Sequence, residues 1–168
     1  MESQKFDIMI GNPPCRTALI FVGIQGSGKT SFYRSCVEPF ACGWKYVSMD
    51  LLHSRRKEEQ EIRECVERGL PFVIDNTNPT AAERRRYLDM LAGKGYRVVC
   101  CFFRSRVKEC VGRNRLRGGT VPAKAIAATS NRLELPSRDE GYDRMYYVKI
   151  VPPHFVVEEY IEDKEEEI

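Results

Sequence analysis

Eight consecutive residues near the start of the chain have the types and spacing needed to hold a polyphosphate. The stretch Gly23-Ile24-Gln25-Gly26-Ser27-Gly28-Lys29-Thr30 matches the pattern G-x-x-x-x-G-K-[ST] at every fixed position. Glycines let the backbone curl so that successive N–H groups point at phosphate oxygens. Lys29 supplies a cation for the β and γ phosphates, and the Thr30 hydroxyl is a hard oxygen ligand for Mg²⁺. We therefore expect ATP and Mg²⁺ as cofactors, with nucleotide contacts from Gly23, Gly26, Ser27, Gly28, Lys29 and Thr30.

The segments around this loop have the order that phosphate binding requires. Residues 17–22 are mostly apolar and predict a buried parallel strand. Residues 31–37 predict a helix with Phe32, Cys36 and Tyr33 near one face. The N-terminal end of that helix adds partial positive charge where the phosphates would lie. Strand, glycine loop and helix therefore form one phosphate-binding unit.

Two further predicted strands end in an acid. Residues 45–50 read as a short strand that ends at Asp50, and residues 70–75 read as an apolar strand that ends at Asp75. Ligands of doubly wound sheets bind outside the carboxyl ends of the strands. Asp50 and Asp75 should therefore converge with the glycine loop on one crevice.

The other segments complete an α/β fold, a mostly parallel sheet flanked by helices. Helices are expected from Leu51 to about Arg68, closed by Gly69; from Pro79, capped by Asn78, to Leu91; over Val107–Leu116; and from Pro122 through Leu133. Strands are expected over residues 96–103 and 146–151. The stretch at about 113–123, with Gly118 and Gly119 as its expected hinge, would form a small helical lid.

Charge is distributed unevenly along the chain. Residues 158–168 hold seven acids and one lysine, or −6, and because the whole 168-residue chain is +3, the remainder carries +9. We expect an N-terminal extension at 1–16, one domain at 17–157, and a disordered acidic tail at 158–168. A body this basic suits a polyanionic partner, although arginines that merely solvate helix faces explain the charge equally well.

The seven cysteines are odd in number and include no C-x-x-C pair, and the chain has only two histidines. This composition argues against a structural zinc site and favours a reducing compartment. The sequence has neither an apolar run of about 18 residues nor a charged leader followed by an apolar segment. We therefore expect no membrane span and an intracellular protein of the nucleus or cytoplasm.

From about Leu19 to Val151 the chain resembles the kinase domain of polynucleotide 5′-hydroxyl kinases, the end-healing enzymes of DNA and RNA repair. The matching segments occur in the family's order: the loop 23–30, the acid Asp50, the stretch Ile74-Asp-Asn-Thr-Asn-Pro79 followed by Arg84-Arg-Arg-Tyr87, and Arg113-Asn-Arg-Leu-Arg117 ahead of Pro122. The glycine loop alone is common to many kinases and GTPases, whereas D-N-T-N-P at that distance is much more specific. The resemblance implies a P-loop kinase fold, transfer of the ATP γ-phosphate to the 5′-hydroxyl end of a nucleic acid, and roles for individual residues.

By this resemblance Asp50 is the general base that takes the proton of the acceptor hydroxyl, although a carboxylate there could also cap the helix expected at Leu51. Arg117 resembles the lid arginine that stabilises the transition state beside the catalytic Lys29, and Arg113 is a less certain second nucleotide contact. Asp75 matches the acid that holds Mg²⁺ together with Thr30, a role that some family members place one residue later, at Asn76 here.

The chain departs from the family around the acceptor. Where some members have arginines that grip the acceptor phosphate, this chain has Met49 and His53. We therefore expect substrate contacts from other side chains as well. The expected set is His53, Asp75, Asn76, Asn78, Arg84 and Arg86, with Arg55 and Arg56 as further candidates.

Two other classes of function stay open. One is a P-loop kinase that acts on a nucleoside, sugar or antibiotic, and the other is a catalytically silent nucleotide-binding module. Intact Lys29, Thr30 and Asp50 argue against the silent module. No D-x-D-G-T segment of the accompanying 3′-phosphatase is present, so the chain would be a kinase alone or a domain of a larger protein.

Overall fold

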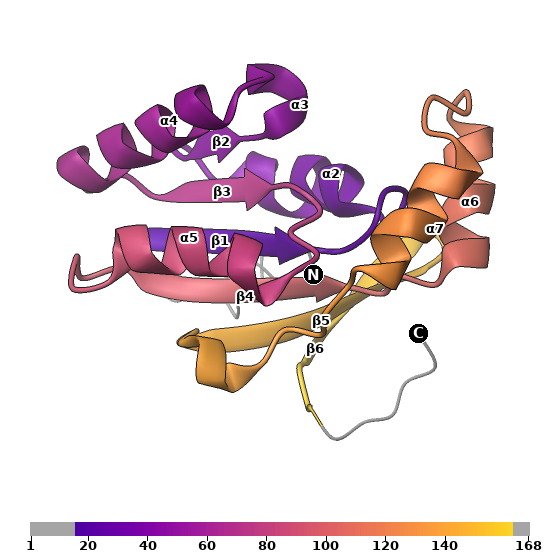
Figure 1. Cartoon of the computed structure of the whole chain (residues 1–168). Helices are drawn as coiled ribbons and strands as arrows, with labels where there is room; N and C mark the ends of the chain where they lie inside the picture. Colours follow the sequence, from indigo (N-terminus) through magenta and orange to yellow (C-terminus); the bar gives the residue numbers. More distant parts are fainter. Residues whose placement is uncertain (1–15, 163–168) are drawn as a thin grey trace.

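A computed structural model describes residues 16–162 of the chain, so residues 1–15 of the predicted N-terminal extension and residues 163–168 lie outside the described part. A single sheet of six strands organises it, in the order β2-β3-β1-β4-β5-β6 (Figure 1). The strands are β1 (Thr17–Val22), β2 (Lys45–Val47), β3 (Phe72–Asp75), β4 (Arg97–Phe103), β5 (Arg144–Val151) and β6 (His154–Glu159). The first five strands of this order, from β2 across to β5, are parallel to one another. β6 is the antiparallel strand and pairs with β5. The predicted mostly parallel sheet is confirmed.

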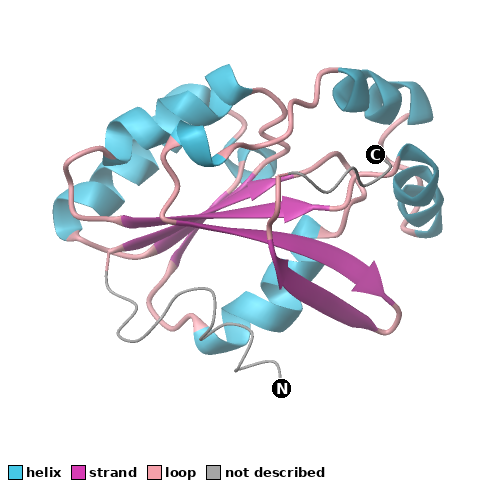
Figure 2. Ribbon diagram, turned by 90° about the horizontal axis from the view of Figure 1, so that it is seen from below, coloured by secondary structure: helices cyan, strands magenta, loops and turns pink. Residues whose placement is uncertain are grey.

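Helices lie on both faces of the sheet (Figure 2). They are α2 (Lys29–Phe32), continued by a π-helical turn η1 (Tyr33–Val37) and a 3₁₀ turn η2 (Glu38–Phe40); α3 (Met49–Leu52); α4 (Arg55–Arg68); α5 (Ala81–Leu91); α6 (Val107–Leu116); α7 (Ala123–Asn131); and the 3₁₀ turn η3 (Arg138–Glu140). Among residues 16–162, no helix is both long and apolar enough to cross a membrane.

The alternation of side chains in the strands divides the core into two layers. Ala18, Ile20 and Val22 of β1 pack with residues of α4 and α5 on one face. Leu19 and Phe21 pack with α2 and η1 on the other face. Because successive strand residues point to opposite faces, a strand buried on both sides must be apolar throughout, as β1 is. The rigid central strand therefore fixes where the loop at residues 23–30 begins.

The long helix expected over residues 51–68 is two helices. α3 begins after Ser48, whose hydroxyl accepts a hydrogen bond from Asp50 N at 3.3 Å, and it ends at His53, which is left-handed (φ 53°). Ser54 then caps α4, which ends at Gly69 as predicted. A serine side chain can accept a hydrogen bond from a free N–H group at the start of a helix. Ser48 and Ser54 do this at the starts of α3 and α4, so each favours a separate helix. The strand predicted at 45–50 accordingly stops at Val47, and Asp50 lies inside α3 without capping it.

Asn78 does not cap α5. Thr80 does, in a capping box with Glu83, and Pro79 precedes the helix. Asn78 is left-handed (φ 46°), 2% exposed, and its Nδ2 donates to the Phe21 carbonyl at 2.7 Å. It therefore ties the segment after β3 to the end of β1, and the substrate contact expected of it is wrong.

The boundary expected for the acidic tail is also corrected. Glu158 and Glu159 belong to β6, a strand that was not predicted from the sequence. Tyr160 after it is 7% exposed and meets the ring of Phe102 edge-on, with centroids 5.8 Å apart. The residues 158–162 are thus part of the fold, since a buried aromatic ring holds them.

Arg84 is a structural residue that no acceptor can reach. It is fully buried and forms a bidentate ion pair with Glu140 at 2.7 and 2.8 Å, which links α5 to η3. Its Nη1 also donates to the carbonyls of Asn78, Pro79 and Glu134. The expected contact of Arg84 with substrate is therefore wrong, because its donors are already used inside the fold.

This arrangement predicts different costs for neighbouring arginines. Arg84→Met should lower the free energy of unfolding by about 3–5 kcal/mol, because Glu140 would stay buried without its partner. Arg86→Met, the matched control, breaks only an ion pair with Glu59 between side chains that are each 40% exposed. It should cost less than about 1 kcal/mol. Urea denaturation measures both, and equal losses would contradict the structural role of Arg84.

The pH dependence offers a second check. Burial by itself would raise the pKa of Glu140, but the hydrogen bonds and charge of Arg84, together with hydrogen bonds from Ser137 and Tyr142, hold that pKa below its ordinary value. A carboxylate with a lowered folded-state pKa stabilises the fold above its unfolded pKa and loses that contribution as pH falls. The difference between wild type and Arg84→Met should therefore shrink in acid.

Candidate active site

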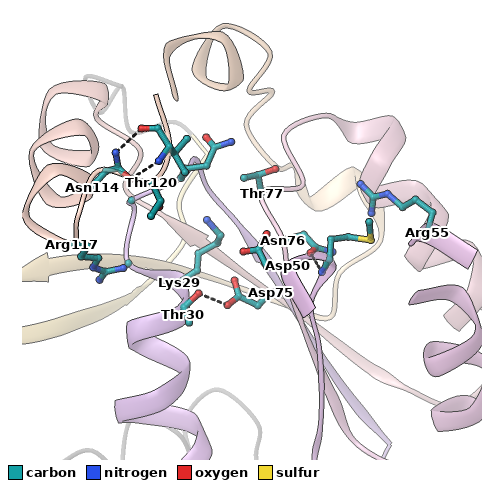
Figure 3. A pocket seen from close by; sticks show the side chains of 15 residues that line it. Lys29, Thr30, Asp50, Arg55, Asp75, Asn76, Thr77, Asn114, Arg117 and Thr120 are labelled. Atoms are coloured by element: carbon teal, nitrogen blue, oxygen red, sulfur yellow. Dashed lines mark hydrogen bonds between the residues drawn. The ribbon is translucent and has the colours of Figure 1, made fainter. Parts of the chain in front are cut away.

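A cavity of about 440 Å³ opens at the carboxyl ends of the strands. In Figure 3, Lys29, Thr30 and Asp75 lie between two walls, with Asn114, Arg117 and Thr120 on one side and Asp50, Arg55 and Asn76 on the other. The remaining lining residues are Gln25, Gly26, Gly28, Met49, Thr77 and Val121. The crevice predicted from strand ends and glycine loop is therefore present.

The glycine loop passes too close to its neighbours for larger residues. A Cβ at Gly26 (φ 80°) would lie 2.5 Å from the Cys110 carbonyl oxygen, and one at Gly28 (φ 101°) would lie 2.7 Å from Ile150 Cδ1. Real Cβ atoms do not approach that closely, and both φ values are unfavourable for other residues. The loop is thereby packed between α6 and the β5–β6 hairpin.

Lys29 lies inside the loop. Its Nζ donates to the carbonyls of Gly23 at 2.8 Å and Ile24 at 3.0 Å, and more weakly to Ser27 Oγ at 3.4 Å. Its side chain is almost fully buried, and this burial lowers the pKa of Lys29, while the nearby Asp75 opposes the shift. The lysine is thus held by carbonyl oxygens at the bottom of the cavity.

Thr30 and Asp75 form a pair of hard oxygen donors next to Lys29. Thr30 Oγ1 donates to Asp75 Oδ2 at 2.8 Å, and the Tyr46 hydroxyl donates to the same oxygen at 2.6 Å. Hydroxyl and carboxylate are the ligand types that Mg²⁺ prefers when phosphates and water complete its shell. The donor set therefore fits Mg²⁺. Within residues 16–162 no cluster of three or more acidic, histidine or cysteine side chains forms an all-protein metal cage.

The wall opposite the lid carries Asp50 and Arg55. Asp50 is exposed and lines the cavity on α3. Asn76 Oδ1 accepts the Met49 N–H at 2.8 Å, which attaches the start of α3 to the segment after β3. Arg55 lines the same wall, and its side chain is 43% exposed. A carboxylate and a cation are thus available on one side of the cavity.

The lid wall is attached to the glycine loop. Arg117 Nη2 donates to Ser31 Oγ at 2.5 Å and lines the cavity. Arg113 does not line it; its Nε donates to the Gly26 carbonyl at 2.7 Å. Asn114 closes the turn by bonding to both backbone groups of Val121. Arg113 therefore contacts the loop backbone, and Asn114 fixes the turn that presents Arg117.

Two other expected substrate contacts lie away from the cavity lining. Arg86 pairs with Glu59 at 2.6 Å, and His53 is exposed at the end of α3. Neither belongs to the lining residues. Of the expected acceptor set, only Asp75 and Asn76 reach the cavity, together with the further candidate Arg55.

Sequence reasoning missed several residues of the site. Gln25, Tyr87 and Asn114 stand inside the quoted motifs but were given no role, and Tyr46 and Glu58 belong to none of them, yet all five line or support the cavity. Gln25 Nε2 bonds to Thr129 Oγ1 of α7 at 3.0 Å, and Glu58 is fully buried. The available signal was a charged residue at 58 on the apolar side of α4, four residues before the buried Ile62.

The chain is similar in sequence to known proteins. Residues 57–136 match a family model described as an AAA domain. The chain is 25% identical over 129 residues to the bifunctional polynucleotide phosphatase/kinase of Schizosaccharomyces pombe, covering 74% of this chain and 31% of the relative. It is 26% identical over 141 residues to an Acanthamoeba polyphaga mimivirus protein named for the same two activities, covering 79% and 33%. The chain thus spans about a third of the length of these curated relatives.

Solved structures show the same fold. A gluconokinase from Sinorhizobium meliloti 1021 superposes with a TM-score of 0.58 at 20% identity, covering 82% of this chain and 85% of that one. A chain of the Pnkp1/Rnl/Hen1 RNA repair complex superposes with a TM-score of 0.59 at 22% identity, covering 71% and 44%. The resemblance stated from the motifs is confirmed: the chain has the fold of P-loop kinases and is similar in sequence to the polynucleotide phosphatase/kinases.

Proposed function

We propose that this kinase transfers the γ-phosphate of ATP to the 5′-hydroxyl end of a polynucleotide, DNA or RNA, in the healing of broken ends. The observation that carries the proposal is the pair Asp50 and Arg55 on one wall of the cavity, facing the wall of Arg117, with Lys29 between them. The sequence likeness to two polynucleotide phosphatase/kinases points to the same acceptor class.

Asp50 is the proposed general base. Its carboxylate is exposed to the cavity, so a hydroxyl can approach it without a rearrangement of the core. Phosphoryl transfer requires mainly positioning and charge stabilisation, and one carboxylate that orients the attacking hydroxyl is sufficient chemistry on the acceptor side. Arg55, the first residue of α4, lines the same wall and is our candidate for the contact with the phosphate next to that hydroxyl.

The donor side is formed by the glycine loop and the lid. Lys29 binds the β and γ phosphates, and Arg117 stabilises charge on the transferring group. Mg²⁺, held through Thr30 and Asp75, would neutralise the phosphate oxygens. Arg113 acts indirectly, because its bond to the Gly26 carbonyl keeps the lid helix against the loop.

A small-molecule kinase is the second candidate. The gluconokinase resembles this chain over 85% of its own length, and the arginines at 84 and 86 are engaged in ion pairs away from the cavity. Such an enzyme would need only the cation at Arg55 on its acceptor side. The two candidates therefore differ in acceptor size and not in donor chemistry.

The direct test is an acceptor panel. The protein is incubated with γ-labelled ATP, Mg²⁺ and 5′-OH DNA, 5′-OH RNA, nucleosides, gluconate and other sugars. We expect label on the oligonucleotides, and Asp50→Asn should reduce transfer by about 10²-fold or more while ATP affinity stays unchanged. Label on a sugar or nucleoside alone would replace the polynucleotide assignment. Near wild-type transfer by Asp50→Asn would remove Asp50 as the base.

Arg117 provides a second test, on the donor side. Arg117→Ala should lower kcat by about 10³-fold with a smaller change in ATP affinity, because its charge acts mainly as the transition state forms. Lysine should rescue poorly, since a point charge cannot reproduce the planar guanidinium. Arg115→Ala is the matched control, in the last turn of α6 two residues before Arg117 and outside the cavity lining. Steady-state kinetics with ATP decide the result, and unchanged turnover in Arg117→Ala would exclude it from the site.

A further inference from the structure

A buried carboxylate lies directly behind the acceptor wall. Glu58 is 0% exposed, one turn into α4, and three side chains donate to it. Arg55 Nη1 donates to Oε2 at 2.9 Å, Asn76 Nδ2 to Oε1 at 2.5 Å, and the Tyr87 hydroxyl to Oε1 at 3.0 Å. Burying a charged carboxylate is costly unless its oxygens are bonded in this way.

Two of the three donors, Arg55 and Asn76, are also bonded to the third, Tyr87. The Tyr87 oxygen accepts from Arg55 Nη1 at 3.0 Å and from Asn76 Nδ2 at 3.2 Å. Burial, and next the Glu58 charge, raise the pKa of Tyr87 to about 12, so its hydroxyl keeps the proton that it donates. Residues from α4, α5 and the segment after β3 thus form one closed network around the carboxylate.

This network determines which way Asn76 faces. With its Nδ2 directed at Glu58 and Tyr87, only the carbonyl oxygen can face Met49, where it accepts the backbone N–H at 2.8 Å. Met49 is the first residue of α3, and Asp50 follows it. The orientation of Asn76 therefore fixes the start of the short helix that presents Asp50 to the cavity.

Stability alone does not account for a carboxylate here. Arg55 is partly exposed and could be solvated without a buried partner, and apolar replacements of buried ion pairs are often neutral or stabilising. Glu58 and Tyr87 do not line the cavity, whereas Arg55 and Asn76 do. The charged network is thus located where it orients two lining side chains.

We propose that Glu58 is a positioning residue for phosphoryl transfer, which orients Arg55 directly and Asp50 through Asn76 and the start of α3. This inference rests on the proposed function for the roles of Asp50 and Arg55. Glu58 does not line the cavity itself. Because it holds Arg55 and Asn76 on the acceptor wall, a change at Glu58 should affect acceptor use and leave ATP use unchanged.

The test is Glu58→Gln, with Glu59→Gln as the matched control. Glutamine has nearly the same shape, but its amide would direct N–H donors at Arg55 or at the Asn76–Tyr87 pair. Glu59 is the next residue and joins only the surface pair with Arg86. We expect Glu58→Gln to lower kcat/KM for the acceptor by about 10²-fold, with KM for ATP within about twofold of wild type. Hydrogen exchange at residues 48–52, which needs no substrate, should accelerate several-fold.

The result that overturns the proposal is a folded Glu58→Gln protein whose exchange and acceptor kinetics equal those of Glu59→Gln. If Glu58→Gln does not fold, Tyr87→Phe replaces it, because it removes one donor to Glu58 at nearly constant volume. Its acceptor kinetics and its hydrogen exchange at residues 48–52 are then measured, and wild-type values of both also overturn the proposal. Failure of the proposed function is recognised separately, because it shows in the acceptor specificity of the wild type. The Glu58 kinetics are then measured with whichever alcohol the wild type phosphorylates.

Discussion

The close packing of the glycine loop against α6 and the β5–β6 hairpin is the constraint on which the rest of the site depends. A side chain at Gly26 would collide with the backbone carbonyl of Cys110, and one at Gly28, where φ is 101°, would force Ile150 to move. The same approach lets Arg113 bond to the Gly26 carbonyl. The base of the lid and the phosphate-binding loop are therefore one unit, and Arg117 takes its position relative to Lys29 from it.

The opposite wall is held by a different kind of interaction. Packing fixes the lid side, whereas a buried polar network around Glu58 fixes the side of Asp50 and Arg55. Polar networks of this kind orient side chains more strictly than apolar contacts do, at a cost in stability when they are incomplete. A donor side held by packing and an acceptor side held by hydrogen bonds would let acceptor selectivity vary without disturbing nucleotide binding.

The features that could be predicted from the sequence are local ones. The glycine loop, the helix at 107–116 and the lining acid Asp75 follow from short patterns in which neighbours along the chain determine the structure. Contacts between distant residues could not be predicted in this way. The spacing of Arg84 from Tyr87, Leu88 and Leu91 places it on the buried face of α5, but Glu140, its partner, is 56 residues away and no local pattern pairs the two. Counting arginines therefore overestimated the positive charge available to an acceptor.

The break after α3 was missed for a related reason. Histidine and serine both occur inside helices, so the residue types at 53 and 54 did not indicate a break. In the structure His53 is left-handed and Ser54 caps α4. The start of α3 is further fixed by Asn76, which accepts the Met49 N–H from a different strand end and which no local pattern indicates. Asp50 reaches the cavity because α3 is separate from α4, so the most important acid of the proposed mechanism owes its position to a tertiary contact.

The central claim is that the acceptor hydroxyl is activated on the wall formed by α3 and the start of α4. A crystal structure of the protein with a non-hydrolysable ATP analogue, Mg²⁺ and a 5′-OH oligonucleotide tests it most directly. We expect the 5′-hydroxyl within about 2.6–3.2 Å of the Asp50 carboxylate, with Arg55 on the adjacent phosphate and Lys29 on the β and γ phosphates. An oligonucleotide end bound elsewhere, with Asp50 and Arg55 facing solvent while the analogue occupies the glycine loop, would contradict it.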